Sequence, residues 1–139
     1  MPEGRTLVAG RAAGLAFVLD APLSFWGGLD PETGKLIDTH HPQRGATITG
    51  RILLMPSGRG SSSSSYVLAE AIRAGTAPAA IVLQEPDGIV ALGAIVAREL
   101  YGTTIPVVVL DADAFDAITD GVAVEVQAEE GEATVWRVT

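Results

Sequence analysis

The sequence predicts an α/β domain with stacked β/β/α layers, and two observations support this prediction. The middle of the chain alternates short apolar runs with segments of helical period, in the order strand, helix, strand, helix, strand. Because right-handed helical crossovers join parallel strands, this order predicts a parallel sheet covered by helices. Both ends of the chain are rich in strand-like segments, and the 139 residues suit one domain over residues 1–139.

The strands are predicted from apolar runs and from alternation between turn signals. Four runs are typical of buried strands; they are residues 10–19, 46–55, 79–83 and 106–110. Pro106 opens the last of them, a position that a strand accepts. Residues 122–126 and 134–138 alternate on either side of Glu-Glu-Gly-Glu, which predicts a hairpin.

The helices are predicted from apolar residues at helical spacing and from their end signals. The three segments are residues 66–74, 88–101, and 111 or 113 to 118. Gly75 and Gly102 are placed to end the first two. Asp87 is placed to cap the second, because a carboxylate there can accept the free N–H groups of the first turn.

Residues 21–45 differ in composition from the rest of the chain, because they contain many glycines, prolines and turn signals. They also contain Phe25 and Trp26, which disordered loops rarely contain. We expect an ordered excursion, with Phe25, Trp26, Gly27 and Gly28 forming an interface or a lid over a substrate. The alternative is that these residues fill the protein's own core.

The net charge of −8 and the lack of cysteine exclude several functional classes. An acidic surface repels phosphate backbones, so we expect no nucleic-acid partner. Without cysteine the chain has no thiol nucleophile and no thiolate ligand of its own. The only histidines, His40 and His41, are adjacent, and neighbouring residues in a strand face opposite ways. We therefore expect no metal site built from this chain alone.

The apolar runs are far shorter than the roughly 20 residues that cross a bilayer as a helix. The first residues, MPEGRTLVAG, lack the basic start and sustained apolar run of a signal peptide. We therefore expect no membrane association and a cytoplasmic location.

A serine-rich segment, PSGRGSSSSSYVLAEAI at residues 56–72, lies between a predicted strand and a predicted helix. A solvated connector is the simpler interpretation of its serine run. Core elements bound the segment, its glycines allow close backbone approach, and the free N–H groups of the following helix favour an anion. The candidate binding residues are Gly58, Arg59, Gly60, Ser62 and Ser63. The residues alone thus predict an anion-binding loop with one or more reactive serines, and no particular reaction.

Two segments of the chain resemble the small subunit of the aconitase X family: PLSFWGGLDPETGKLIDTHHPQRG and PSGRGSSSSSYVLAEAIRAGTAPAAIVLQEPDGIVALGAIVARELYGTTIPVVVL. The resemblance implies a swivelling β/β/α domain of the aconitase type. It also implies a hydro-lyase that removes water from a small hydroxy acid and is active only with a large subunit. The family's Gly-basic-Gly-Ser pattern makes Ser61 the proton acceptor. An iron or iron–sulfur cluster would be held by the large subunit.

The resemblance leaves the substrate open between two branches. Bacterial members dehydrate cis-3-hydroxy-L-proline, and archaeal members dehydrate mevalonate 5-phosphate. The archaeal loop tends to read Gly-Lys/Arg-Gly-Ser-Thr-Val-Gly-Ser, whereas the bacterial loop tends toward polyserine, as in GRGSSSSS here. We therefore expect cis-3-hydroxy-L-proline to be converted to Δ1-pyrroline-2-carboxylate, with phosphomevalonate dehydratase as the alternative.

Two functions of other classes also fit the residues. The same loop would serve in a stand-alone anion-binding module, which needs no large subunit. A phosphotransfer domain that swivels would need a histidine on a loop, and His41 before Pro42 is the candidate.

Overall fold

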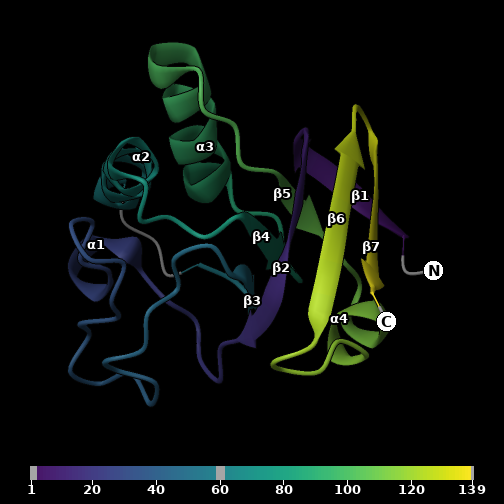
Figure 1. Cartoon of the computed structure of the whole chain (residues 1–139), viewed down its shortest axis with the longest axis horizontal. Helices are drawn as coiled ribbons and strands as arrows, with labels where there is room; N and C mark the ends of the chain where they lie inside the picture. Colours follow the sequence, from purple (N-terminus) through teal and green to yellow (C-terminus); the bar gives the residue numbers. More distant parts are fainter. Residues whose placement is uncertain (1–2, 59–61, 139) are drawn as a thin grey trace.

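The computed structural model describes residues 3–58 and 62–138, which form a closed barrel with the helices of residues 25–28, 63–74 and 88–101 on one side (Figure 1). The barrel order is β1-β5-β4-β3-β2-β6-β7. The strands are β1 (Glu3–Val8), β2 (Gly10–Val18), β3 (Ile52–Met55), β4 (Ala80–Leu83), β5 (Val107–Val109), β6 (Ala123–Glu129) and β7 (Glu132–Arg137). The helices are α1 (Phe25–Gly28), α2 (Ser63–Ala74), α3 (Gly88–Tyr101) and α4 (Ala112–Asp116).

The predicted parallel sheet is the half of the barrel formed by β2, β3, β4 and β5. Every residue of β3 and β4 is buried, because helices cover one face and the rest of the barrel covers the other. Ile52 and Leu54 point into the barrel, while Leu53 and Met55 pack toward the helices. Figure 1 shows α1, α2 and α3 on this side, with β6 and β7 on the opposite side of the barrel. The predicted β/β/α layers are therefore confirmed.

The barrel closes through β1, a strand that the sequence did not predict. β1 pairs antiparallel with β5 and, at its first residues, with β7. Its sequence, Glu-Gly-Arg-Thr-Leu-Val, lacks the regular alternation of a half-buried strand. The strands of the predicted layers therefore join into one closed sheet.

Two predicted elements have different bounds in the structure. The strand expected from residue 46 begins only at Ile52, because Gly50, with a φ of +71°, forms a turn just before it. The helix expected from residue 66 begins at Ser63, so it includes three serines of the run. This earlier start places part of the serine run inside regular structure.

The excursion of residues 21–45 is ordered and packs on the protein's own core. Leu23, Phe25, Leu29 and Leu36 are buried in the cluster that lies between the parallel strands and the helices. A bridge between Leu29 and Leu36 closes part of the excursion on itself.

Among the described helices, none has the length and apolarity needed to cross a bilayer.

Candidate functional site

The serine loop, residues 56–62, follows β3 at the carboxyl edge of the parallel strands. Ligands of open α/β sheets commonly bind outside this edge. The structure describes residues 56–58 and Ser62 of the loop. The predicted base Ser61 and the predicted binding residues Arg59 and Gly60 lie outside the described residues, so their roles stay predictions.

The first end of the loop is bonded to the connection between β4 and α3. The carbonyl oxygen of Pro56 accepts hydrogen bonds from the backbone N–H groups of Gln84 at 3.1 Å and Glu85 at 3.0 Å. Gly58 forms a parallel bridge with Leu23 of the excursion. The loop therefore leaves β3 along a path that two neighbouring segments determine.

Asp87 lies against this end of the loop and also caps α3. Its Oδ1 accepts from the N–H groups of Ile89 at 2.9 Å and Val90 at 3.2 Å, which confirms the predicted cap. A Cβ atom on Gly58 would collide with Oδ2 of the same carboxylate. Gly58, a predicted binding residue, therefore packs closely against the Asp87 carboxylate.

The second end of the loop is bonded to α1 through Ser64. This side chain is 4% exposed, and its Oγ accepts from the backbone N–H of Trp26 at 3.0 Å. The same Oγ lies 3.0 Å from the Oγ of Ser24. The sequence predicts binding roles for Ser62 and Ser63, but the contact of Ser64 with α1 was not predicted. Its position three and four residues before the buried Val67 and Leu68 is the signal that places it on the inner face of α2.

The predicted binding residues Ser62 and Ser63 are exposed at the start of α2. Ser62 is the N-cap residue, but no side-chain cap hydrogen bond to it is found in the described part of the chain. The hydroxyl of Ser65 donates to the carbonyl oxygen of Ser62 at 2.7 Å, which closes the first turn. Both predicted residues thus lie at the positive end of the α2 dipole.

The four residues of α1 divide between the two roles that the sequence left open. Phe25 and Gly28 are buried and pack in the core. Trp26 is 59% exposed, and Gly27 beside it is exposed with a φ of +75°. Phe25 and Gly28 therefore fill the core, while Trp26 and Gly27 are available to a substrate or partner.

His41 has a structural environment. It is buried, its Nδ1 accepts from the N–H of Gln43 at 3.1 Å, and its Nε2 lies 3.2 Å from the carbonyl oxygen of Ala21. Accepting at Nδ1 places the ring proton on Nε2, which then donates to Ala21. With both ring nitrogens engaged, the geometry argues against phosphoryl transfer through His41.

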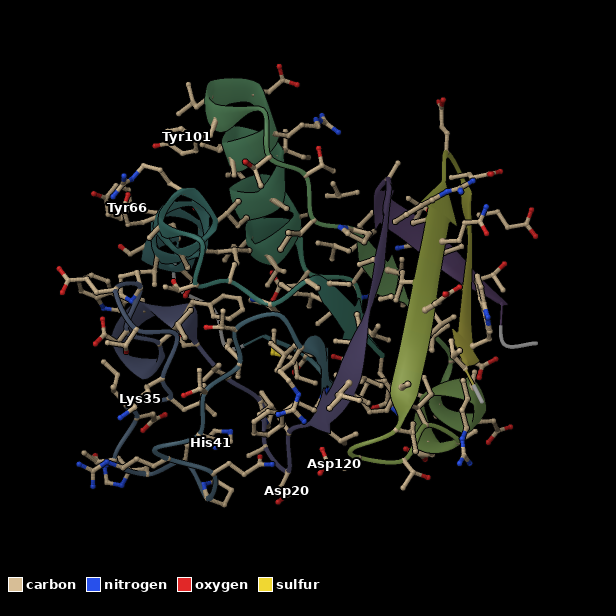
Figure 2. The ribbon with its side chains drawn as sticks, in the orientation of Figure 1. Asp20, Lys35, His41, Tyr66, Tyr101 and Asp120 are labelled. Carbon is tan, nitrogen blue, oxygen red and sulfur yellow. The ribbon has the colours of Figure 1, made fainter. Side chains whose placement is uncertain are left out.

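A groove of about 240 Å³ lies between α2 and α3, starting at Ser65 beside the serine loop. Tyr66 and Tyr101 stand along it on the two helices, as Figure 2 shows. Glu70 also lines it and is paired with Arg73 on the same helix. The hydrogen bonds that Arg73 donates to the Glu70 carboxylate lower the pKa of Glu70 and raise the pKa of Arg73.

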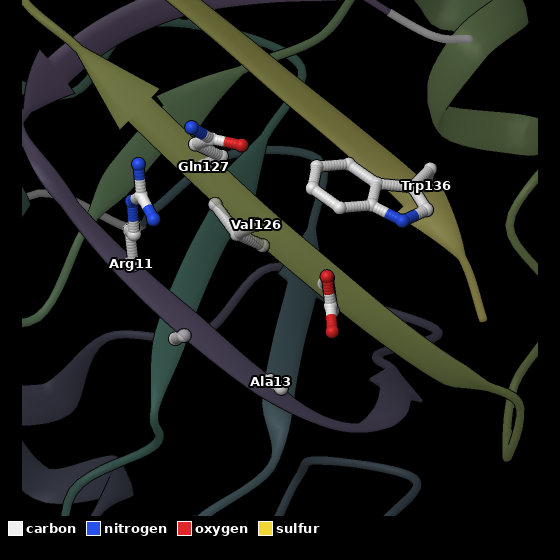
Figure 3. Close-up of a pocket in the computed structure, with 7 residues that line it drawn as sticks. Arg11, Ala13, Val126, Gln127 and Trp136 are labelled. Carbon is white, nitrogen blue, oxygen red and sulfur yellow. The ribbon is translucent and has the colours of Figure 1, made fainter.

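A larger hollow of about 350 Å³ lies on the outside of β2, β6 and β7 (Figure 3). Arg11, Gln127 and Trp136 line it. Arg11 is near the start of β2, whereas the serine loop lies beside the end of β2 in the parallel sheet. This hollow is therefore separate from the candidate site.

No group of three or more histidine, aspartate or glutamate side chains that could hold a metal ion is found among residues 3–58 and 62–138. The chain also lacks cysteine. The described residues therefore do not fit an iron ion or an iron–sulfur cluster.

Relatives of this chain are named dehydratases. It is 53% identical over 114 residues to a cis-3-hydroxy-L-proline dehydratase of Pseudomonas aeruginosa, covering 82% of this chain and 20% of that protein. It is 41% identical over 128 residues to a phosphomevalonate dehydratase small subunit of Methanothermobacter thermautotrophicus, covering 91% of this chain and 93% of that protein. The chain thus spans about one fifth of the length of the first relative and nearly all of the second.

Solved structures and a family model agree on the fold. A crystal structure of Thermococcus kodakaraensis aconitase X in its holo-form is 39% identical, with a TM-score of 0.83 over 98% of this chain and 99% of that one. A solution NMR structure of a UPF0107 protein is 37% identical, with a TM-score of 0.81 over 96% of each chain. The model of the aconitase X swivel domain matches residues 1–135. The chain therefore belongs to the aconitase X swivel domain family.

Proposed function

We propose that this chain is the small-subunit part of an aconitase X-type hydro-lyase and works with a large subunit to dehydrate a small hydroxy acid. The observation that carries the proposal is the sequence Gly-Arg-Gly-Ser, which comes three residues after the end of β3 in a chain of the aconitase X swivel family. Relatives that share this fold are named dehydratases. The name small subunit, borne by archaeal relatives, supports the need for a partner.

The substrate that we propose is cis-3-hydroxy-L-proline. The 53% identity with the hydroxyproline dehydratase of Pseudomonas aeruginosa supports it, as does the polyserine run from residue 61 to residue 65. Mevalonate 5-phosphate is the second candidate. The small subunit of Methanothermobacter thermautotrophicus supports this candidate, because the match covers more than nine tenths of both chains.

Ser61 is the proposed base of a β-elimination. Its oxygen, as alkoxide, takes the α-proton beside the substrate carboxylate, and the C–H electron pair forms the Cα–Cβ double bond as the 3-hydroxyl leaves with the C–O electron pair as hydroxide. The hydroxide then takes a proton from the Ser61 hydroxyl, directly or through solvent, which forms water and restores the alkoxide. The N–H groups of the loop and the guanidinium of Arg59 stabilise the carboxylate as enolate charge develops. The enamine product then isomerises to Δ1-pyrroline-2-carboxylate. The role of Ser61 rests on the family pattern, and that of Arg59 on its positive charge and forked donors.

The iron or iron–sulfur cluster is proposed to belong to the large subunit. The cysteine-free sequence and the lack of a ligand group in the described ranges support this assignment. The residues of this chain would then supply the base and the carboxylate contacts, with the exposed Trp26 and Gly27 facing the substrate or the large subunit.

Purification of the chain from its own cells, followed by assay of the isolated complex on both hydroxy acids, tests the proposal. We expect a cysteine-containing large subunit to co-purify, and the complex to form Δ1-pyrroline-2-carboxylate from cis-3-hydroxy-L-proline. Turnover of mevalonate 5-phosphate instead would support the second candidate. A chain that purifies alone and binds carboxylates without turnover would support a stand-alone anion-binding module and contradict the dehydratase.

A further inference from the structure

One short segment of the excursion contacts both described ends of the serine loop. Leu23 forms a bridge with Gly58, which precedes residues 59–61. Ser24 and Trp26 are hydrogen-bonded to Ser64, which follows them. Residues 23–26 therefore fix the separation between the two ends of the loop that contains the proposed base.

The contact at the second end depends on one hydroxyl. Because the Ser64 oxygen accepts from the N–H of Trp26, its own proton is available to the Ser24 oxygen. The hydroxyl is thus satisfied in a buried position, as buried polar groups must be. Alanine is the better residue for a helix, so the propensity of α2 does not explain a serine here, whereas these two bonds do.

These contacts also determine how Trp26 is presented. The backbone N–H of Trp26 donates to the Ser64 hydroxyl, and the neighbouring Phe25 is buried in the core at 1% exposure. These two contacts hold the backbone at Trp26 in place. The indole nevertheless remains 59% exposed. The side chain thus projects from a fixed backbone next to the start of α2, against which α1 packs.

We propose that Ser64 is a positioning residue for the dehydration. By bonding Ser24 and Trp26 it holds α1 against the start of α2. It thereby fixes the exposed Trp26 and the described residues that flank the proposed base Ser61 in the sequence. Ser64 acts through these residues and does not contact the substrate. This inference rests on the proposed function.

The test compares Ser64→Ala with the wild type in two measurements. In the full 139-residue chain, amide hydrogen exchange by NMR should show the Trp26 N–H exchanging at least about tenfold faster, because it loses its acceptor. In the complex with the large subunit, kcat should fall by about 10- to 100-fold with KM changed by less than about threefold, since misplaced groups slow the chemical step.

Two further variants separate a specific role from a general loss of structure. Ser65→Ala removes a hydroxyl of the same turn, whose bond within the described residues is to the Ser62 carbonyl oxygen, and should leave kcat within about twofold of the wild type. Ser24→Ala removes one of the two bonds and should lower kcat less than Ser64→Ala. The kcat of the Ser24→Ala/Ser64→Ala double variant should lie within about twofold of that of Ser64→Ala, because both changes remove the same contact.

The possible failures are distinguishable. An active wild-type complex whose Ser64→Ala variant has normal kcat would overturn the role of Ser64 alone, as would unchanged exchange of the Trp26 amide. A wild-type complex that dehydrates neither substrate would overturn the proposed function and this role with it.

Discussion

The two carboxylate oxygens of Asp87 contact different elements of the site. Oδ1 caps α3, and Oδ2 packs against the backbone of Gly58 at the start of the serine loop. The cap was predictable from sequence because it is a local signal, an aspartate directly before a run of helical period. The contact with Gly58 was not, because it joins residues that follow two different strands.

Replacing Asp87 separates these contributions. Asp87→Ala should lower the free energy of unfolding by about 1 kcal/mol, since two N–H groups at the start of α3 lose their acceptor. Asp87→Asn keeps an oxygen at the same position and should lose less than about 0.5 kcal/mol. Urea denaturation measures both values. Equal stability of the two variants would show that the cap contributes nothing.

At the scale of elements, the serine run is part loop and part helix. The helical spacing of the apolar residues predicts a helix only from Tyr66, whereas α2 begins at Ser63. The packing of α2 on α3 explains the difference. Gly93 of α3 lies under Ser65, and a Cβ there would be 2.8 Å from the Ser65 carbonyl oxygen and 3.1 Å from the Leu68 Cβ. Tertiary contact thus stabilises a helical turn that propensity does not favour.

Two glycines of α3 provide a matched test of this packing. Gly93→Ala should lower the free energy of unfolding by about 1–3 kcal/mol, because the new methyl group displaces α2 at its first turn. Gly88→Ala, where a Cβ would meet nothing within 4 Å, should leave stability unchanged or raise it by up to about 1 kcal/mol. Thermal or urea unfolding compares them, and similar losses in both variants would contradict close packing at Gly93.

At the scale of the whole molecule, the parallel half of the barrel was predictable and its closure was not. Apolar runs such as Ala-Ile-Val-Leu in β4, each followed by a helix, leave little choice but a buried parallel sheet. Closure depends on β1 pairing with β5 and β7, which come from the other end of the chain, and these pairs leave no periodic signal in β1. The contacts of Ser64 could not be predicted for the same reason, because its partners Ser24 and Trp26 lie 40 and 38 residues away in the sequence.

In the candidate site, too, features formed by consecutive residues could be predicted, whereas features that depend on contacts between distant residues could not. The strand, the glycine-serine loop and the helix that follows it are consecutive in sequence, so an anion-binding loop could be predicted from the residues alone. The division of α1 into a buried Phe25 and an exposed Trp26 depends on how the excursion folds back on α2. Only the folded chain separates the core residue from the residue available to a partner.

The decisive measurement is the rate of product formation by the complex carrying Ser61→Ala, beside the matched Ser65→Ala complex. If Ser61 is the base, its loss should slow dehydration by about 100- to 10,000-fold while the large subunit still co-purifies. The Ser65→Ala complex should stay within about twofold of the wild type. A Ser61→Ala complex that retains nearly the wild-type rate would contradict the assignment of proton abstraction to the serine loop.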